Sequence, residues 1–208
     1  MAKIRRDLEQ VRRHRALLRR PRRKVPFPIV ALVGYTNAGK SSLMNALTRA
    51  GVTVRDQLFA TLDPTLRRLM LPGDRVALLS DTVGFIRKIP HQLVAAFQAT
   101  LEEVQEAELL LHVVDISHPH AELQQAAVEA VLGDLGLADR PTILVYNKID
   151  RLGQRPEFPW GPGSGRVATS AKTGVGLDGL RREIVAALNG NVAAAVAPGD
   201  FERSEAAC

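Results

Sequence analysis

Apolar and polar positions change period several times along the chain, and each change predicts a strand or a helix. Short apolar runs and alternating stretches predict strands at 29–33, 66–71, 75–80, 109–114, 142–147 and 166–169. Apolar positions at helical spacing predict helices at 40–49, 91–107, 120–133 and 176–188. Strands that alternate with helices in this way predict an α/β fold, in which helices cover both faces of one sheet.

The residues before this domain follow a different pattern. Residues 3–20 contain neither Gly nor Pro, and Ile4, Leu8, Val11 and Leu18 form a narrow apolar seam that predicts a helix. Three prolines in the following PRRKVPFP exclude a helix and indicate a linker. We therefore divide the chain into a basic helical segment at 1–24, a globular domain at 25–190 and an alanine-rich tail at 191–208, which we expect to be flexible.

Charge is concentrated in that first segment. The 208 residues carry a net charge of +6, but residues 1–24 hold eleven Lys or Arg and two acids, so the rest of the chain is slightly acidic. A basic block favours a polyanion such as RNA, DNA or an anionic membrane surface, although a solvated helix face has the same composition. No apolar run is long enough to span a bilayer, and Cys208 is the single cysteine. We expect a monomeric cytoplasmic protein.

A phosphate-binding loop follows the first predicted strand. The sequence GYTNAGKS, which begins at Gly34, fits the P-loop pattern and opens a predicted helix. Gly34 and Gly39 let backbone amides approach the phosphates of a nucleotide. We expect Lys40 to reach the β and γ phosphates, Ser41 to bind Mg²⁺ and Ser42 to donate to the α phosphate.

A guanine-binding motif follows the strand at 142–147. In the sequence NKID, Asp150 can accept hydrogen bonds from N1 and the exocyclic amine of guanine, a donor pair that adenine lacks. Asn147 would hold the N7 side of the base and join the loops, and the stem of Lys148 would lie along the ring. The SAK sequence at 170–172 ends the next strand and could support the base through backbone amides.

Two further segments have the features of nucleotide sensors. Asp81 ends a strand and should meet Mg²⁺, and the Gly84 amide should contact the γ phosphate. A threonine between the first helix and the hairpin would bind Mg²⁺ in the GTP state, and Thr61 and Thr65 both qualify on spacing. Phe85 stands where many GTPases have a glutamine that orients water, and it offers no hydrogen bond.

Five sequence motifs of the chain, taken together, resemble those of one family. The sequences GYTNAGKSSLMNALT, DQLFATLDPTLRR, DTVGFIRKIPHQLVAAFQATLEEV, HVVDISHP and NKID resemble the GTP-binding (G) domain of the HflX GTPases. The resemblance runs from about Arg5 to Leu188. It implies a Ras-like mixed sheet, GTP hydrolysis, binding to the large ribosomal subunit and its rRNA, and a role in splitting or rescuing ribosomes under stress. By analogy, Thr61 is the threonine that binds Mg²⁺. Members normally carry a large N-terminal domain that ends in a long basic helix, and by this resemblance we expect residues 1–24 to correspond to that helix alone.

The resemblance also suggests what compensates for Phe85. Some GTPases with a hydrophobic residue at this position use an asparagine of the P-loop to bind K⁺, and Asn37 occupies that place. We therefore expect slow intrinsic hydrolysis that K⁺ stimulates. The alternative for Asn37 is a residue that makes local turn hydrogen bonds.

The expected site comprises three overlapping sets of residues. The catalytic set is Asn37, Lys40, Thr61 and Gly84. The metal ligands are Ser41, Thr61 and Asp81. The nucleotide contacts are Gly34, Tyr35, Thr36, Asn37, Ala38, Gly39, Lys40, Ser41, Ser42, Asp81, Gly84, Asn147, Lys148, Asp150, Ser170, Ala171 and Lys172.

Three other functions remain open from the sequence. The chain could be a GTP-dependent RNA-binding module with little turnover, whose basic helix contacts rRNA phosphates. It could be another GTPase of this class that acts in tRNA modification or ribosome assembly, although the sequence motif DQLFATLDPT argues against this. It could also be a remnant that keeps only nucleotide binding.

Overall fold

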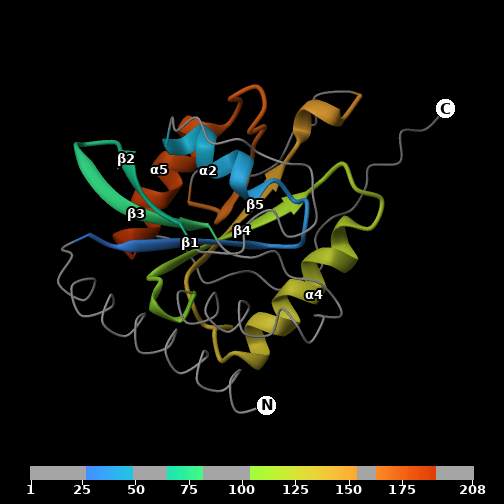
Figure 1. The fold of residues 1–208 in the computed structure, drawn as a ribbon, viewed down its shortest axis with the longest axis horizontal. Coiled ribbons are helices and arrows are strands. Elements are labelled where there is room, and N and C mark those ends of the chain that lie inside the picture. Colours follow the sequence, from blue (N-terminus) through green and yellow to red (C-terminus); the bar gives the residue numbers. More distant parts are fainter. Residues whose placement is uncertain (1–26, 49–64, 82–103, 154–162, 191–208) are drawn as a thin grey trace, which may run out of the picture.

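A computed structural model of the chain describes residues 27–48, 65–81, 104–153 and 163–190 (Figure 1). The strands are β1 (Ile29–Gly34), β2 (Thr65–Leu71), β3 (Arg75–Asp81), β4 (Leu109–Asp115), β5 (Thr142–Asn147) and β6 (Arg166–Ala168). The helices are α2 (Lys40–Thr48), α4 (Ala121–Asp134), α5 (Leu177–Leu188) and the short 3₁₀ helix η2 (Ile149–Arg151).

Every predicted element that falls on these residues is present, with ends within one residue of the prediction. The predicted helix at 91–107 is described only from residue 104 onwards, where residues 104–106 are helical. The predicted basic helix at 3–20 and the whole tail at 191–208 lie outside the described residues. None of the helices in the described part of the chain has the length and apolar character that crossing a membrane requires.

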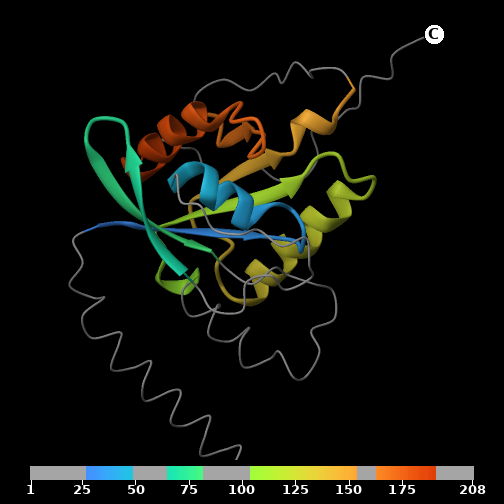
Figure 2. The ribbon, with the colours of Figure 1, turned by 45° about the horizontal axis from the view of Figure 1, so that its top comes forward.

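The six strands form one mixed sheet in the order β2-β3-β1-β4-β5-β6. β2 and β3 are the predicted antiparallel hairpin, and every other neighbouring pair is parallel. Helices α2 and α5 lie on one face and α4 lies on the other, as Figure 2 shows. The parallel strands therefore end at one edge of the sheet, and the loops that follow them meet there.

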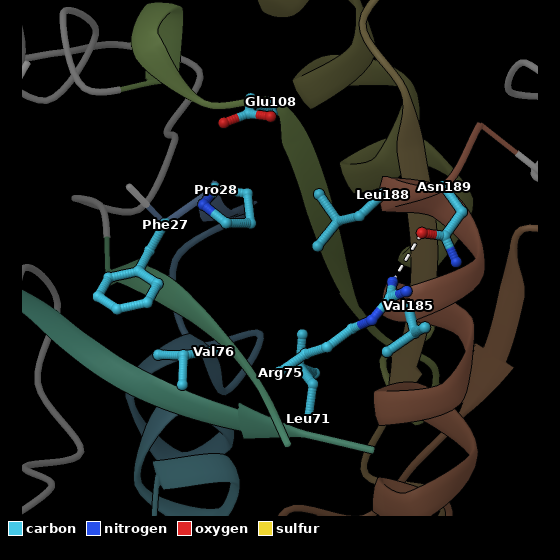
Figure 3. Close-up of a pocket in the computed structure, with 9 residues that line it drawn as sticks. All are labelled: Phe27, Pro28, Leu71, Arg75, Val76, Glu108, Val185, Leu188 and Asn189. Carbon is cyan, nitrogen blue, oxygen red and sulfur yellow. Dashed lines mark hydrogen bonds between the residues drawn. The ribbon is translucent and has the colours of Figure 1, made fainter. Parts of the chain in front are cut away.

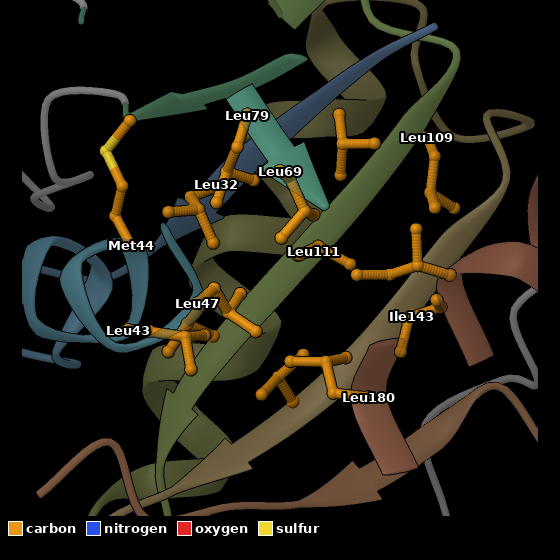
Figure 4. Close-up of a cluster of buried hydrophobic side chains, with 14 of the residues drawn as sticks. Leu32, Leu43, Met44, Leu47, Leu69, Leu79, Leu109, Leu111, Ile143 and Leu180 are labelled. Carbon is orange, nitrogen blue, oxygen red and sulfur yellow. The ribbon is translucent and has the colours of Figure 1, made fainter. Parts of the chain in front are cut away.

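The core is built from the two faces of these strands. On one face, side chains such as Leu32, Leu111 and Ile143 pack against Leu43 of α2 and Leu180 of α5 (Figure 4). On the other face, residues of β1 and β4 pack against α4. All seven residues of the central strand β4 are buried, as the continuous apolar run LLLHVV predicts for a strand covered on both sides.

His112 lies within that central strand. Its side chain is only 1% exposed, so it lies within the core of the sheet. Burial, reinforced by the positive charge of Lys40, lowers the pKa of His112 to about 3. The imidazole is therefore neutral at physiological pH.

A hollow of about 480 Å³ lies near the start of β1 and the end of α5 (Figure 3). Phe27, Val76 and Leu188 contribute apolar walls, and Arg75 crosses it to donate a 2.7 Å hydrogen bond to the Asn189 side chain. This hollow is lined by residues near the amino ends of β1 and β4. It is therefore separate from the loops that follow the parallel strands.

Candidate nucleotide site

The predicted phosphate loop connects β1 to α2. Gly39 has a φ of 96°, and a Cβ at this position would overlap the side-chain amide of Asn147. Asn37 has a left-handed φ of 62°, a conformation that asparagine tolerates better than most residues. The backbone path therefore requires glycine at position 39, where the loop lies against Asn147 at the end of β5, and it favours asparagine at position 37.

Lys40 is the first residue of α2, and its side chain turns back into the loop. Its Nζ donates hydrogen bonds to the carbonyl oxygens of Gly34 at 3.0 Å and Tyr35 at 2.9 Å. The side chain is only 6% exposed, and burial lowers its pKa from 10.5 to about 8, although the nearby Asp81 carboxylate acts to raise it. A buried cation at a helix N-terminus is well placed to attract phosphate.

The predicted metal ligands Ser41 and Asp81 lie next to each other. The Ser41 hydroxyl donates a 2.7 Å hydrogen bond to Oδ2 of Asp81, although 40 residues separate them in sequence. Hard oxygen donors of this kind suit Mg²⁺, whose neighbouring ligands in an octahedron lie about 2.9 Å apart. The two residues therefore fit a shared Mg²⁺ in both chemistry and spacing.

Asn147 joins three loops. Its side-chain amide, only 1% exposed, donates to the carbonyl of Ala38 in the phosphate loop at 3.0 Å. Its Oδ1 accepts a 3.1 Å hydrogen bond from the amide of Ala171 and a weaker one from the Thr169 hydroxyl at 3.5 Å. The loop-joining role predicted for Asn147 is therefore visible in the geometry.

Lys148 links the base motif to the phosphate loop in a way that the sequence did not reveal. Its Nζ donates to the carbonyl of Asn37 at 2.6 Å and forms a 2.7 Å ion pair with Asp115, the last residue of β4. The other oxygen of Asp115 accepts hydrogen bonds from the hydroxyl and amide of Ser117, at 2.6 and 3.1 Å. Burial acts to raise the pKa of Asp115, but the hydrogen bonds and charge of these partners outweigh it and lower the pKa.

Asp115 is thus a site residue that sequence reasoning missed. Its position at the carboxyl end of a buried strand was the available signal, because Asp81 and Asn147, which the sequence predicts as site residues, also lie at strand ends of this sheet.

Asp150 is held by the turn that follows β6. The hydroxyl of Ser170, itself fully buried, donates a 2.6 Å hydrogen bond to Oδ1 of the exposed Asp150. The same hydroxyl accepts from the amide of Thr173, and the Ser170 amide donates to the carbonyl of Val175. The SAK turn therefore fixes the carboxylate that is expected to recognise guanine.

Not all predicted site residues can be placed. Thr61 and Gly84, together with Phe85, lie outside the described residues. Thr65, the alternative to Thr61, is the first residue of β2 and pairs with Asp81 across the hairpin. Tyr35, Thr36 and Ser42 lie in the phosphate loop and the first turn of α2, and Lys172 lies in the SAK turn.

Fold and site together define a P-loop nucleotide-binding domain. A family model described as "50S ribosome-binding GTPase" matches residues 29–148. The chain is 55% identical to the GTPase HflX of Magnetococcus marinus over 183 residues, which is 88% of this chain and 42% of that protein. It is 46% identical to the GTPase HflX of Escherichia coli, over 93% of this chain and 46% of that protein.

The chain belongs to this family of GTPases, as a member of its HflX branch. It spans less than half the length of these two relatives. Among solved structures, a GTP-binding protein from Sulfolobus solfataricus in complex with GDP superposes with a TM-score of 0.61 at 28% identity, over 86% of this chain and 58% of that one.

Proposed function

We propose that this domain binds GTP with Mg²⁺ and hydrolyses it to GDP and phosphate. The observation that carries the proposal is the contact of Asn147 with both Ala38 and Ala171. It joins a phosphate loop to two segments that have the features of a guanine site. The likeness to a GTP-binding protein that holds GDP supports the same nucleotide class.

The residues around the phosphate loop neutralise the charge of the phosphates and hold them in position. Lys40 exchanges its two carbonyl acceptors for the β and γ phosphates, and the amides of the loop and of α2 donate to the same anion. Ser41 and Asp81 hold Mg²⁺, which neutralises phosphate charge when bound. From the sequence we add Thr61 as a third metal ligand and Gly84 as a γ-phosphate contact.

The residues around the NKID and SAK motifs select guanine over adenine. Asp150 accepts from the two donors of guanine, and Ser170 holds it in place. Lys148 lies along the base while its ammonium group is fixed by Asn37 and Asp115. Adenine would leave the Asp150 carboxylate without its partners, which is an effective way to reject a ligand.

K⁺ is proposed as the cation that assists hydrolysis, since Phe85 cannot orient water. Asn37 is exposed at the turn of the phosphate loop, and Lys148 fixes its carbonyl. GTP turnover should be several-fold faster in KCl than in NaCl at equal ionic strength. Equal rates in the two salts would refute this part of the proposal.

The large ribosomal subunit is the proposed partner, with ribosome splitting or rescue as the role of the intact family member. The family description and the HflX relatives support this proposal. The test is GTP turnover with and without purified large subunits in K⁺ buffer. Strong stimulation is expected if the G domain couples to the ribosome by itself. Turnover that subunits leave unchanged would contradict that coupling.

The charge of residues 1–24 favours a second candidate, an RNA-binding module with little turnover. In that case rRNA binding should weaken steeply with salt, because released counterions contribute most of the affinity. The two candidates differ in the subunit experiment, since the second predicts binding without faster hydrolysis.

We also propose that the chain is divided into a basic segment at 1–24, a G domain at 25–190 and a tail at 191–208.

A further inference from the structure

Helix α5 carries a buried carboxylate that has no place in the site described so far. Glu183 lies on the side of α5 that faces the sheet, and only 5% of it is exposed. Its Oε2 accepts a 2.9 Å hydrogen bond from the amide of Gly163, and its Oε1 accepts one of the same length from Gly165. A buried carboxylate is costly unless hydrogen bonds compensate it, so this pairing is a specific feature rather than an incidental contact.

These two glycines lie immediately before β6. Both have left-handed backbones, with φ of 82° for Gly163 and 68° for Gly165, and their amides donate to the two oxygens of the same carboxylate. The carbonyl of Gly165 accepts from the amide of Leu144 in β5 at 2.8 Å. The clamp formed by Glu183, Gly163 and Gly165 therefore fixes where β6 begins relative to its neighbour.

β6 depends on such an anchor because it is short and lies at the edge. It has three residues, and in the described sheet its one neighbour is β5. Immediately beyond it are Ser170 and Ala171, which contact Asp150 and Asn147. If the register of β6 against β5 shifted by one residue, the turn after β6 would move by about 3.3 Å, which is enough to break both hydrogen bonds.

We propose that Glu183 is a positioning residue for guanine selectivity. It acts through β6 on the turn that holds Asp150 and Asn147, and it touches neither nucleotide nor metal. This inference rests on the proposed function, because it assumes that Asp150 reads the base. The proposal predicts that a substitution of Glu183 weakens binding of the base more than binding of the phosphates, since Lys40 and Ser41 belong to a different part of the sheet edge.

The test is Glu183→Gln, with binding of GDP and IDP measured in competition with a fluorescent GDP analogue. IDP carries hypoxanthine, which lacks the exocyclic amine of guanine. A glutamine side chain keeps the shape but turns an NH₂ group towards one of the two glycine amides, which leaves that amide without an acceptor. We expect the Kd for GDP to rise about tenfold, in line with one lost hydrogen bond to a charged group. The Kd for IDP should rise by a smaller factor, because hypoxanthine keeps the N1 donor but lacks the exocyclic amine, so it has one hydrogen bond to Asp150 to lose instead of two.

Asp178→Asn is the matched control. It removes an acid from the same helix, but the Asp178 carboxylate is exposed and pairs with Arg181 at the surface. Both dissociation constants should stay as in the unaltered chain. If Glu183→Gln fails to fold, Glu183→Asp keeps the charge but shortens the reach by one methylene, and the same ratio is measured on it.

The outcomes separate the two proposals. An unaltered chain that binds IDP as tightly as GDP would overturn the proposed guanine site itself. A chain that prefers GDP, with the same preference in Glu183→Gln, would overturn only the role of Glu183. Equal weakening for both nucleotides would also overturn it, because it would indicate a general loosening of the domain.

Discussion

The ion pair between Asp115 and Lys148 should contribute directly to nucleotide retention, and Asp115→Asn tests this. The substitution keeps the oxygen that Ser117 contacts but places an NH₂ group opposite the Lys148 ammonium, where the 2.7 Å ion pair was. Lys148 keeps its 2.6 Å hydrogen bond to the Asn37 carbonyl, so it is not left without an acceptor.

The size of the effect follows from exposure. Hydrogen bonds to charged groups contribute about 1.5–3 kcal/mol, and the lower end applies because the Lys148 side chain is 20% exposed while that of Asp115 is 9% exposed. About 1.4 kcal/mol corresponds to a tenfold change in an equilibrium constant. We therefore expect GDP to dissociate roughly ten times faster from Asp115→Asn.

Stopped-flow release of a fluorescent GDP analogue, chased with unlabelled GDP, measures this rate. Asp134→Asn is a suitable control, since it also exchanges an aspartate for asparagine but lies exposed at the end of α4. A dissociation rate within twofold of the unaltered chain would refute the reasoning. It would show that the Asn37 carbonyl alone is enough to position Lys148.

Three further predictions concern the phosphate loop and the core. Gly39→Ala should abolish GDP binding in a titration, because the methyl group would overlap the Asn147 amide at a φ of 96°. Lys40 has a pKa of about 8 in the fold against 10.5 in the unfolded chain, so the unfolded chain binds more protons between these values. The free energy of unfolding should therefore rise from pH 8 to 10, and Lys40→Met should flatten that rise in urea titrations. His112 binds protons more readily when unfolded, so stability should fall from pH 6.5 towards 3, and less steeply in His112→Gln.

The fold could be predicted from the sequence because its strands are continuous apolar runs with turn residues at their ends. The run 142–147 and the hairpin around Pro72–Asp74 are local signals that need no tertiary information. Long-range polar partners could not be predicted in this way. Glu183 is one of several charged residues on α5, and only the folded chain shows that it meets two glycine amides.

Within the site, too, some residues could be predicted from sequence motifs and others only from the folded chain. The P-loop and the NKID motif were recognisable because the chemistry requires fixed residue types at fixed spacing. Asp115 follows no such rule, since its partner Lys148 lies 33 residues away and the pair forms only when β4 and β5 are neighbours. The sequence therefore predicts the residues proposed to contact the ligand more readily than the residues that hold these in position.

The three-way contact of Asn147 also has a consequence for how the chain acquires its ligand. Its partners Ala38 and Ala171 lie 109 residues before it and 24 residues after it. At a synthesis rate of about 5–20 residues per second, roughly 7–27 s separate the appearance of the phosphate loop from that of the last partner. The joined site can therefore form only after Ala171 has been synthesised, and the earlier strands and helices must remain folded, or be protected, until then.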